Sequence, residues 1–298
     1  MAADPFIGWM TDIQQRVERT LEAALPPAEA EPCALHQAMR YATLGGGKRV
    51  RPLLVCAAGE IVGAAPDNLL RIGAAIEMIH AYSLVHDDMP CMDDDVLRRG
   101  KATCHVAYGE ANALLTGDAL QTLAFEVLAT PLPGVAPAEQ LAMLATLSRA
   151  AGHAGMAGGQ AIDLASVGQP LTLPELEFMH LLKTGALIRA AVLLGARAGT
   201  PLPAERLARL DHFAKRIGLA FQVVDDVLDC EADTQTLGKT AGKDADNDKP
   251  TYVSLMGLSE AKRFARELRD DAFAALADFG PAAERLGALA DYIVARSF

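Results

Sequence analysis

Apolar residues recur at helical spacing along almost the whole chain, and this periodicity constrains the fold more than any other feature. Alanine and leucine dominate the apolar positions, and the alternation of β-branched residues that is typical of strands is missing. We therefore predict an all-α protein. About ten helices are expected, over Phe6–Leu25, Cys33–Leu44, Pro52–Val62, Asp67–Met89, Ala111–Thr130, Ala138–Met156, Pro174–Ala198, Ala204–Cys230, Ser259–Ala277 and Pro281–Ala295.

The predicted helices follow one another without a composition break. No Pro/Gly/Ser-rich linker, low-complexity tract or fixed-period repeat interrupts the 298 residues, and a 51% hydrophobic content is enough for one large core. We expect a single domain over residues 1–298.

Charge and targeting features exclude several classes of protein. The net charge of −11 disfavours binding to nucleic acid, which requires a basic face. Residues 1–10 lack a basic region followed by an apolar stretch, and no run of eighteen apolar residues is free of charge. Five cysteines are scattered without metal-site spacing, which is typical of reduced thiols. We expect a cytoplasmic protein without stable membrane insertion.

An acidic cluster lies near the end of the helix expected over Ala204–Cys230. Gln222, Asp225 and Asp229 fall on one helical face by their spacing of three and four residues. Like charges one turn apart destabilise a solvated helix by roughly 0.2–0.5 kcal/mol, and desolvation increases their repulsion. A bound cation would remove this cost.

A second acidic cluster follows the apolar residues 78–85. Five aspartates occur between Asp87 and Asp95, and on a straight helix Asp93 would lie well away from the face of Asp87. Pro90 is expected to kink or end the helix and to bring Asp93 back toward Asp87. Carboxylates alone suit a hard cation such as Mg²⁺, which binds one or two of them together with the phosphate oxygens of a substrate.

Basic residues are also clustered, although the chain is acidic. Lys48, Arg49 and Arg51 form one group, and Arg98, Arg99 and Lys101 form another. The polar segment 231–250 carries Lys239, Lys243 and Lys249 and is expected to be a loop that could close over a phosphate ligand. Two basic clusters beside two acidic ones indicate anionic, diphosphate-like ligands.

These motifs occur together in the order seen in trans-isoprenyl diphosphate synthases, which the chain resembles over about residues 30–257. The matching segments are Gly46–Pro52, His80–Asp95, Arg98–Gly100, Gly158–Gln160, Lys183–Gly185 and Phe221–Asp226. The resemblance is strongest to the bacterial members that make the fifteen-carbon farnesyl diphosphate. It implies a helical bundle around a deep central cavity, a homodimer, and an Mg²⁺-dependent prenyltransferase, with Mn²⁺ as a possible substitute.

The resemblance also implies which residues bind the metal and the two substrates. The metal ligands would be Asp87, Asp88, Asp93, Asp225, Asp226 and Asp229. The allylic substrate, dimethylallyl or geranyl diphosphate, would be held by Arg98, Lys183, Lys239 and Lys249. Isopentenyl diphosphate would be held by Gly47, Lys48, Arg51, His80 and Arg99.

The implied reaction ionises the allylic diphosphate and adds the double bond of isopentenyl diphosphate to the carbocation. Arg98 and Lys183 would assist the departure of diphosphate, and the Thr184 hydroxyl and the Gln222 amide oxygen would stabilise the cation. Tyr82 and Ser83 precede Asp87 by five and four residues, and we expect them to limit product length by forming the cavity floor. Tyr82 as an ordinary core residue is the alternative.

Three other functions share parts of this pattern. Glu77-x-x-His80 and Glu177-x-x-His180 fit the spacing of ferritin-like di-iron bundles. A class I terpene cyclase would share the carboxylate–magnesium site but would have no role for Lys48, Arg51 and His80. A non-catalytic subunit of a heteromeric prenyl synthase would not need both aspartate clusters.

Overall fold

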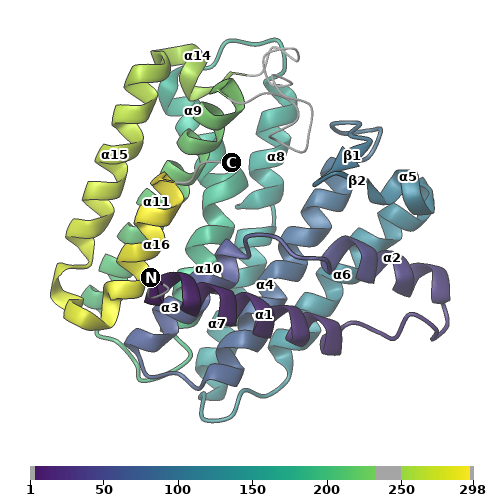
Figure 1. Cartoon of the computed structure of the whole chain (residues 1–298), viewed down its shortest axis with the longest axis horizontal. Coiled ribbons are helices and arrows are strands. Elements are labelled where there is room, and N and C mark those ends of the chain that lie inside the picture. The colour runs from purple at the N-terminus through teal and green to yellow at the C-terminus, as the bar shows by residue number, and fades with distance from the viewer. Residues whose placement is uncertain (1–3, 232–249, 296–298) are drawn as a thin grey trace. The chain divides into compact units, whose positions relative to one another are not determined.

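The structure, a computed structural model, describes residues 4–231 and 250–295 (Figure 1). Almost all of this part of the chain that forms regular structure is helical, and the prediction of an all-α fold is confirmed. The chain divides into two compact units. The first comprises Met1–Ala145 with Leu194–Thr200, and the second comprises Thr146–Leu193 with Pro201–Phe298.

Most of the first unit is formed by its N-terminal helices and one short hairpin. Its elements are α1 (Pro5–Ala24), α2 (Cys33–Thr43), α3 (Val50–Ile61), α4 (Pro66–Asp87), β1 (Leu97–Arg98), β2 (Lys101–Ala102), α5 (Cys104–Tyr108) and α6 (Glu110–Ala129). Helix α7 (Pro137–Ala151) begins in this unit and ends in the second.

Helix α4 is the centre of the first unit. It contacts α1, α2, α3 and α6, and its residues are buried on most sides of the helix. A helix that is apolar all round belongs in a core, and this burial explains why the run 69–85 contains so few charges. The exception is Glu77, a buried acid whose partner is described below.

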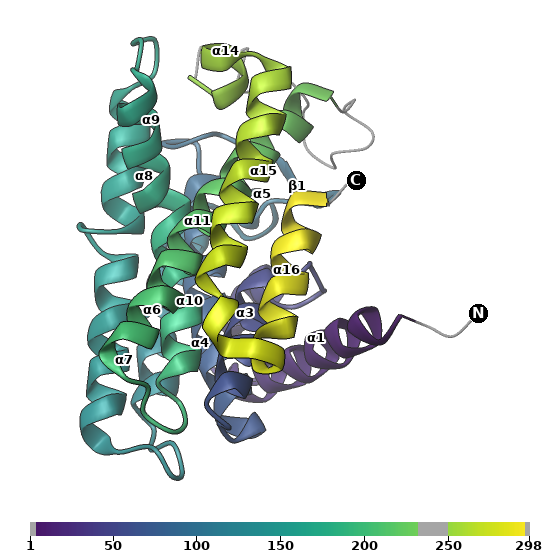
Figure 2. The same cartoon turned by 90° about the vertical axis from the view of Figure 1, so that its left-hand side faces the viewer.

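The second unit is formed around the long helix α11. Its elements are α8 (Met156–Ala165), α9 (Leu173–His180), η1 (Leu181–Gly185), α10 (Ala186–Ala196, which ends in the first unit), α11 (Ala204–Glu231), α14 (Tyr252–Met256), α15 (Leu258–Ala275), η2 (Ala277–Ala283) and α16 (Glu284–Ala295). Helices α11 and α15 lie side by side along most of their length, as both views show (Figure 2).

Several local features differ from the sequence-based expectation, which also lacked α8 and α14. The helix expected over Pro174–Ala198 contains one π-helical turn, η1, between α9 and α10. The segment after the first acidic cluster forms the β1–β2 hairpin and α5, neither of which was expected. The last helix begins at Glu284 because the residues around Pro281 form the 3-10 turn η2.

One described helical stretch, Leu173–Ala196, is long and apolar enough to cross a membrane by length and composition alone. In its most apolar window 56% of the residues are buried inside the protein, and the stretch carries Lys183. The core helix of a soluble protein has these properties, and the apolar surface of the stretch is used for packing.

Candidate active site

The first acidic cluster lies where α4 ends. The helix stops at Asp87, and the chain then folds back, so that the Asp93 N–H donates to the Asp87 carbonyl oxygen at 2.9 Å. The Asp95 N–H donates in the same way to the Asp88 carbonyl oxygen at 3.2 Å. The predicted break near Pro90 is therefore confirmed, and the backbones of Asp87 and Asp93 are adjacent.

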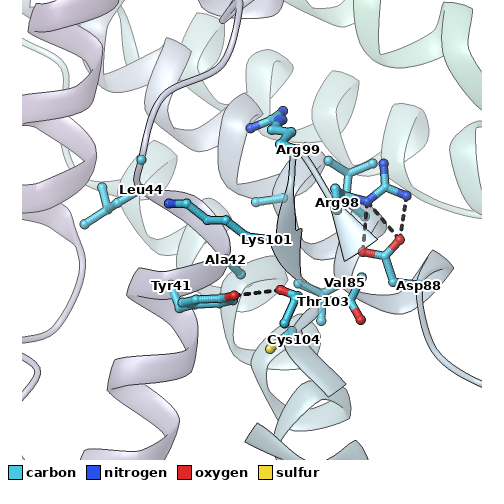
Figure 3. Close-up of a pocket in the computed structure, with 14 residues that line it drawn as sticks. Tyr41, Ala42, Leu44, Val85, Asp88, Arg98, Arg99, Lys101, Thr103 and Cys104 are labelled. Atoms are coloured by element: carbon cyan, nitrogen blue, oxygen red, sulfur yellow. Dashed lines mark hydrogen bonds and ion pairs between the residues drawn. The ribbon is translucent and has the colours of Figure 1, made fainter. Parts of the chain in front are cut away.

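The carboxylate of Asp88 binds a guanidinium. Asp88 is only 3% exposed, and Arg98 donates to both of its oxygens from Nε at 2.8 Å and to one from its terminal nitrogen at 2.5 Å (Figure 3). A bidentate pair of this kind fixes the guanidinium in orientation as well as in distance. The role of Asp88 as a metal ligand stays a prediction. In the structure, Asp88 positions Arg98.

The β1–β2 hairpin places Arg98 and its neighbour Arg99. Arg98 pairs with Lys101 across the hairpin, and the two turn residues, Arg99 and Gly100, both have positive φ, as a two-residue turn between right-twisted strands requires. The Arg99 side chain donates to the Gly46 carbonyl oxygen at 3.1 Å. A Cβ atom on Gly47 would lie 2.8 Å from the same guanidinium, so glycine is needed there.

The predicted isopentenyl diphosphate ligands all belong to the first unit. Lys48 and Arg51 lie at the start of α3, and His80 lies on α4 two turns before Asp87. Burial lowers the pKa of His80 well below its usual value, and the charges of Arg51 and Arg99 lower it further. His80 is therefore neutral at pH 7.

Tyr82 and Ser83, the predicted floor residues, also lie on α4. The Tyr82 ring is 8% exposed and packs edge-on against His86, with 5.8 Å between ring centroids. Its hydroxyl is hydrogen-bonded to Gln121 of α6. Ser83 donates to the His80 carbonyl oxygen at 2.9 Å. These contacts hold the Tyr82 ring between α4 and α6.

In the second unit the π-helical turn η1 carries Lys183 and Thr184. Single π turns inside α-helices are frequent at functional sites, because the extra residue re-aims side chains. Two glycines allow neighbouring helices to approach this turn. A Cβ atom on Gly159 of α8 would lie 2.2 Å from the Lys183 backbone nitrogen, and one on Gly218 of α11 would lie 2.9 Å from the Gly185 Cα.

The Lys183 ammonium group is held by a residue that the sequence analysis did not identify. Asp163, on α8, accepts from Lys183 Nζ at 2.5 Å and is only 6% exposed. Asp163 lies one turn after Gly159 and Gln160, which the sequence analysis did single out. The spacing of three and four residues was the available signal, because it places a carboxylate on the helical face beside those two residues.

Thr184, Gln222 and Asp226, which are predicted site residues of the second unit, form a chain of hydrogen bonds. The Thr184 hydroxyl donates to the Gln222 amide oxygen at 2.9 Å, and the Gln222 amide nitrogen donates to Asp226 at 2.9 Å. The other Asp226 oxygen accepts from the Tyr252 backbone N–H at 2.8 Å. Asp226 is 5% exposed, whereas Asp225 and Asp229 are half-buried. The structure thus separates Asp226, which is directed inward, from the pair that periodicity placed on one face.

The chemistry of the half-buried carboxylates suits magnesium. Within residues 4–231 and 250–295, no three or more His, Cys, Asp or Glu side chains are grouped as a complete metal cage. Mg²⁺ keeps several waters and is commonly bound by one or two carboxylates plus substrate phosphates, so two small carboxylate groups fit it. Lys239, Lys243 and Lys249 lie outside the described residues.

The Glu-x-x-His motifs do not fit a di-iron centre. Glu77 is 3% exposed and accepts from the Arg49 guanidinium at 2.7 Å, which occupies it in an ion pair. His180 is buried, and neither of its ring nitrogens has a hydrogen-bond partner within the described part of the chain. Glu77 is thus a buried, paired residue.

Comparison with known proteins identifies the family of this chain. The Polyprenyl synthetase family matches residues 32–278. The farnesyl diphosphate synthase of Escherichia coli (strain K12) is 48% identical over 287 residues, which cover 95% of this chain and 96% of that protein. The chain belongs to the polyprenyl synthetase family.

Solved structures extend the comparison to the fold. The apo crystal structure of an FPP/GFPP synthase from Zymomonas mobilis has a TM-score of 0.87 and 43% identity, covering 97% of this chain and 98% of that one. A geranyltransferase from Helicobacter pylori, complexed with magnesium and isoprenyl diphosphate, has a TM-score of 0.87 and 32% identity, covering 99% and 100%. The similarity to both structures therefore extends over nearly the full length of this chain.

His180, directly before the π turn, predicts a pH dependence of stability. Burial, together with the charge of Lys183, lowers its pKa to about 4, although the charge of Asp163 opposes the shift. Below the unfolded value of about 6.5 the unfolded chain binds a proton that the folded chain does not, so stability falls as the pH decreases toward 4. Between pH 7 and 5 the loss from this group is about 2 kcal/mol.

The measurement is the free energy of unfolding by urea at pH 7 and pH 5. The variant His180→Phe, which keeps a ring beside Tyr252, should lose about 2 kcal/mol less than the wild type over this range. His153→Phe is the matched control, because His153 is exposed, and its profile should follow the wild type. Equal losses in the wild type and His180→Phe would contradict the assignment.

Proposed function

We propose that this chain condenses isopentenyl diphosphate with dimethylallyl or geranyl diphosphate in an Mg²⁺-dependent reaction that yields trans,trans-farnesyl diphosphate. The chain reversal at Pro90, which brings Asp93 back to Asp87 directly before the Arg98–Arg99 hairpin, carries this proposal. It places an acidic and a basic cluster within one unit, as a metal–diphosphate ligand requires. Farnesyl diphosphate synthases at 47–50% identity support the product.

The metal would be held by Asp87 and Asp93 in the first unit and by Asp225 and Asp229 in the second. When bound, Mg²⁺ neutralises the charge of the diphosphate and makes it a better leaving group. Mn²⁺, with a similar preference for oxygen ligands, is proposed as a substitute. Asp88 and Asp226 would act from behind these ligands, because their carboxylates are bound by Arg98 and by Gln222 with the Tyr252 N–H.

The chain's own residues would bind and orient the two substrates. Arg98 and Lys183, each fixed by a buried carboxylate, would hold the allylic diphosphate, with Lys239 and Lys249 assisting. Isopentenyl diphosphate would be held by Gly47, Lys48, Arg51, His80 and Arg99. Since Lys183 and Arg98 are already oriented before substrate binds, little side-chain entropy is lost on binding.

Bond making follows the departure of diphosphate. The allylic C–O bond breaks, the isopentenyl double bond attacks the carbocation, and a proton is then lost to the released diphosphate. The Thr184 hydroxyl oxygen can face the cation with a lone pair, because its hydrogen is donated to Gln222. A fixed dipole of this kind stabilises positive charge without attacking it.

We further propose that both units form one catalytic domain, because the family match over residues 32–278 extends across both. The proposed protein is a cytoplasmic homodimer. A groove bordered by α1, α2 and α6 supports self-association, since the exposed Leu115 and the half-buried Ala119 of α6 line it. Leu114, which is 48% exposed, adds apolar surface beside it.

The first test of the proposed function concerns turnover and its dependence on the metal. The purified chain, incubated alone with Mg²⁺, isopentenyl diphosphate and geranyl diphosphate, should release diphosphate and form farnesyl diphosphate, and chelation of the metal should abolish turnover. Asp225→Asn should lower kcat by about 10²–10³, since it removes charge stabilisation in the transition state. Asp67→Asn, whose side chain is 96% exposed at the far end of α4, should be unchanged. Absence of turnover by the wild type would favour a non-catalytic subunit.

The second prediction concerns product length. Tyr82→Ala should convert the fifteen-carbon product into a twenty-carbon product, because it removes the ring packed between α4 and α6. Tyr82→Phe keeps the ring and loses only the hydrogen bond to Gln121, so it should still make farnesyl diphosphate. Product chain lengths measured by mass spectrometry check this. Lower yield with unchanged length would identify Tyr82 as an ordinary core residue.

The third prediction concerns the dimer. Light scattering should give twice the chain mass for the wild type, and Leu115→Glu should shift the chain to monomer. Two symmetry-related leucines, each contributing about 1.5–3 kcal/mol of burial, would weaken the dimer by at least about 100-fold when replaced by charge. Phe178→Glu changes a residue that is 57% exposed on α9, outside the groove, and should leave the dimer intact. Dimeric Leu115→Glu would place the interface elsewhere.

A further inference from the structure

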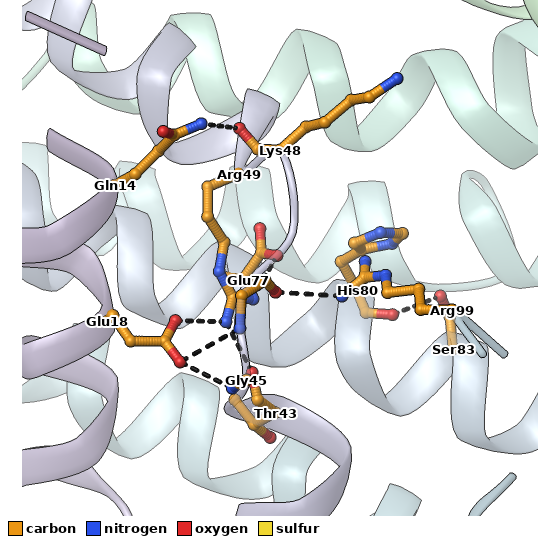
Figure 4. Close-up of polar contacts among 11 residues, drawn as sticks. Gln14, Glu18, Thr43, Gly45, Lys48, Arg49, Glu77, His80, Ser83 and Arg99 are labelled. Carbon is orange, nitrogen blue, oxygen red and sulfur yellow. Dashed lines mark hydrogen bonds and ion pairs between the residues drawn. The ribbon is translucent and has the colours of Figure 1, made fainter. Parts of the chain in front are cut away.

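A buried guanidinium lies between two carboxylates behind the predicted isopentenyl diphosphate ligands. Arg49 is 5% exposed and donates to Glu77 of α4 at 2.7 Å, to Glu18 of α1 at 2.6 Å and to the Thr43 carbonyl oxygen at 2.8 Å (Figure 4). We call Glu18, Arg49 and Glu77 the buried triad. It connects three segments of the first unit that are separated in sequence by about thirty residues each.

The triad also fixes the backbone on which the basic ligands are carried. Arg49 has a φ of 49°, which is uncommon for a residue other than glycine, and the preceding Gly45, Gly46 and Gly47 all have positive φ. The second oxygen of Glu18 accepts from the N–H groups of Gly45 at 2.7 Å and Gly46 at 3.3 Å. One carboxylate therefore holds both the glycine loop and the guanidinium that follows it.

The predicted ligands surround this cluster. Lys48 and Arg51 flank Arg49 in sequence, and the Lys48 carbonyl oxygen accepts from Gln14 of α1 at 2.9 Å. Arg99 donates to Gly46, the same loop that Glu18 holds. His80 lies one turn after Glu77 on α4. A shift of the triad would therefore move the backbone segments that carry or contact these predicted ligands.

Charge balance gives the triad a second effect. Burial opposes the charge on Arg49, but Glu77 and Glu18 outweigh burial and raise its pKa. For Glu18, burial likewise opposes ionisation, yet the hydrogen bonds from Arg49 and Gly45 hold its pKa below the usual value. Two carboxylates with one guanidinium leave a net charge of −1 among cations that would otherwise repel one another.

We propose that Glu18, Arg49 and Glu77 are positioning residues for the diphosphate of isopentenyl diphosphate. They act through the glycine loop and the residues it carries, and they do not themselves contact the substrate. The inference rests on the proposed function, because it assigns the triad to one of the two substrate subsites of that reaction. Different carboxylates are assigned to the two subsites. The triad positions the ligands of the isopentenyl subsite, whereas Asp88 and Asp163 hold the cations proposed for the allylic subsite.

The test is steady-state kinetics of Glu18→Gln and Arg49→Lys, with each substrate varied at saturation of the other. Glutamine keeps the size of Glu18 but removes its charge, and lysine keeps the charge of Arg49 but cannot reach three acceptors as a planar fork does. KM for isopentenyl diphosphate should rise about tenfold or more, as expected for a small displacement of binding groups. KM for geranyl diphosphate should stay within about twofold of the wild type.

The matched control is Glu22→Gln. Glu22 lies one turn after Glu18 on the same helix, and it pairs with Arg40 at 3.4 Å in a contact whose carboxylate is 62% exposed. An exposed pair contributes little, so both KM values should be unchanged. If Arg49→Lys does not fold, Glu18→Gln still decides the question, since the Glu18 side chain is 32% exposed and its replacement leaves no cavity.

The outcomes distinguish the two levels of the proposal. A lower melting temperature with both KM values unchanged would show that the triad is only structural, and equal increases in both KM values would remove its assignment to one subsite. Either result overturns the inference and leaves the proposed function standing. A wild-type chain that forms no prenyl product would overturn the proposed function itself.

Discussion

Repulsion between neighbouring charges is the constraint on which the charged residues of each unit depend. A protein that binds two diphosphates must hold several cations close together before the ligands arrive, and cations so placed repel one another. In each unit, carboxylates bind these cations and reduce their repulsion. Asp88 binds Arg98, Asp163 binds Lys183, and Glu18 with Glu77 binds Arg49. Burial makes these acids effective, since water screens them little, and it makes the removal of either partner costly.

The backbone around these pairs is adapted to bring them into reach. Gly159 lets α8 approach the π turn closely enough for Asp163 to meet Lys183. The positive φ of Gly45, Gly46 and Gly47 turns the chain so that Arg49 enters the core while Lys48 and Arg51 lie on either side of it. Glycines in a sequence of this kind therefore mark close approaches of backbone to backbone or to a guanidinium.

The sequence predicted features that depend on local spacing. Helical periodicity placed Asp225 and Asp229 on one face of α11, and the steric effect of proline predicted the end of α4 near Pro90. Both effects act within a few residues, so one chain read alone is sufficient to find them.

Features that depend on tertiary contact were not predicted. Asp163 lies 20 positions from Lys183, and Glu18 lies 31 positions from Arg49, and nothing in the spacing of either pair identifies the partner. Asp88 belongs to a recognisable cluster, but its pairing with Arg98 follows from the β1–β2 hairpin, whose two-residue strands are too short to give a periodic signal. The carboxylates that pair with these cations can therefore be identified only from the tertiary structure.

Product length is the property that the fold decides least. The Escherichia coli relative and the Zymomonas mobilis synthase bear names with different products, yet both align with nearly the whole of this chain. A shared fold whose members bear names with different products indicates that side chains, and not the backbone fold, set the length. Tyr82 meets the physical requirement for such a side chain: its ring is large, buried, and held by His86 on its own helix and by Gln121 on the next. A ring that is held from two helices resists displacement, whereas a ring held from one could rotate away.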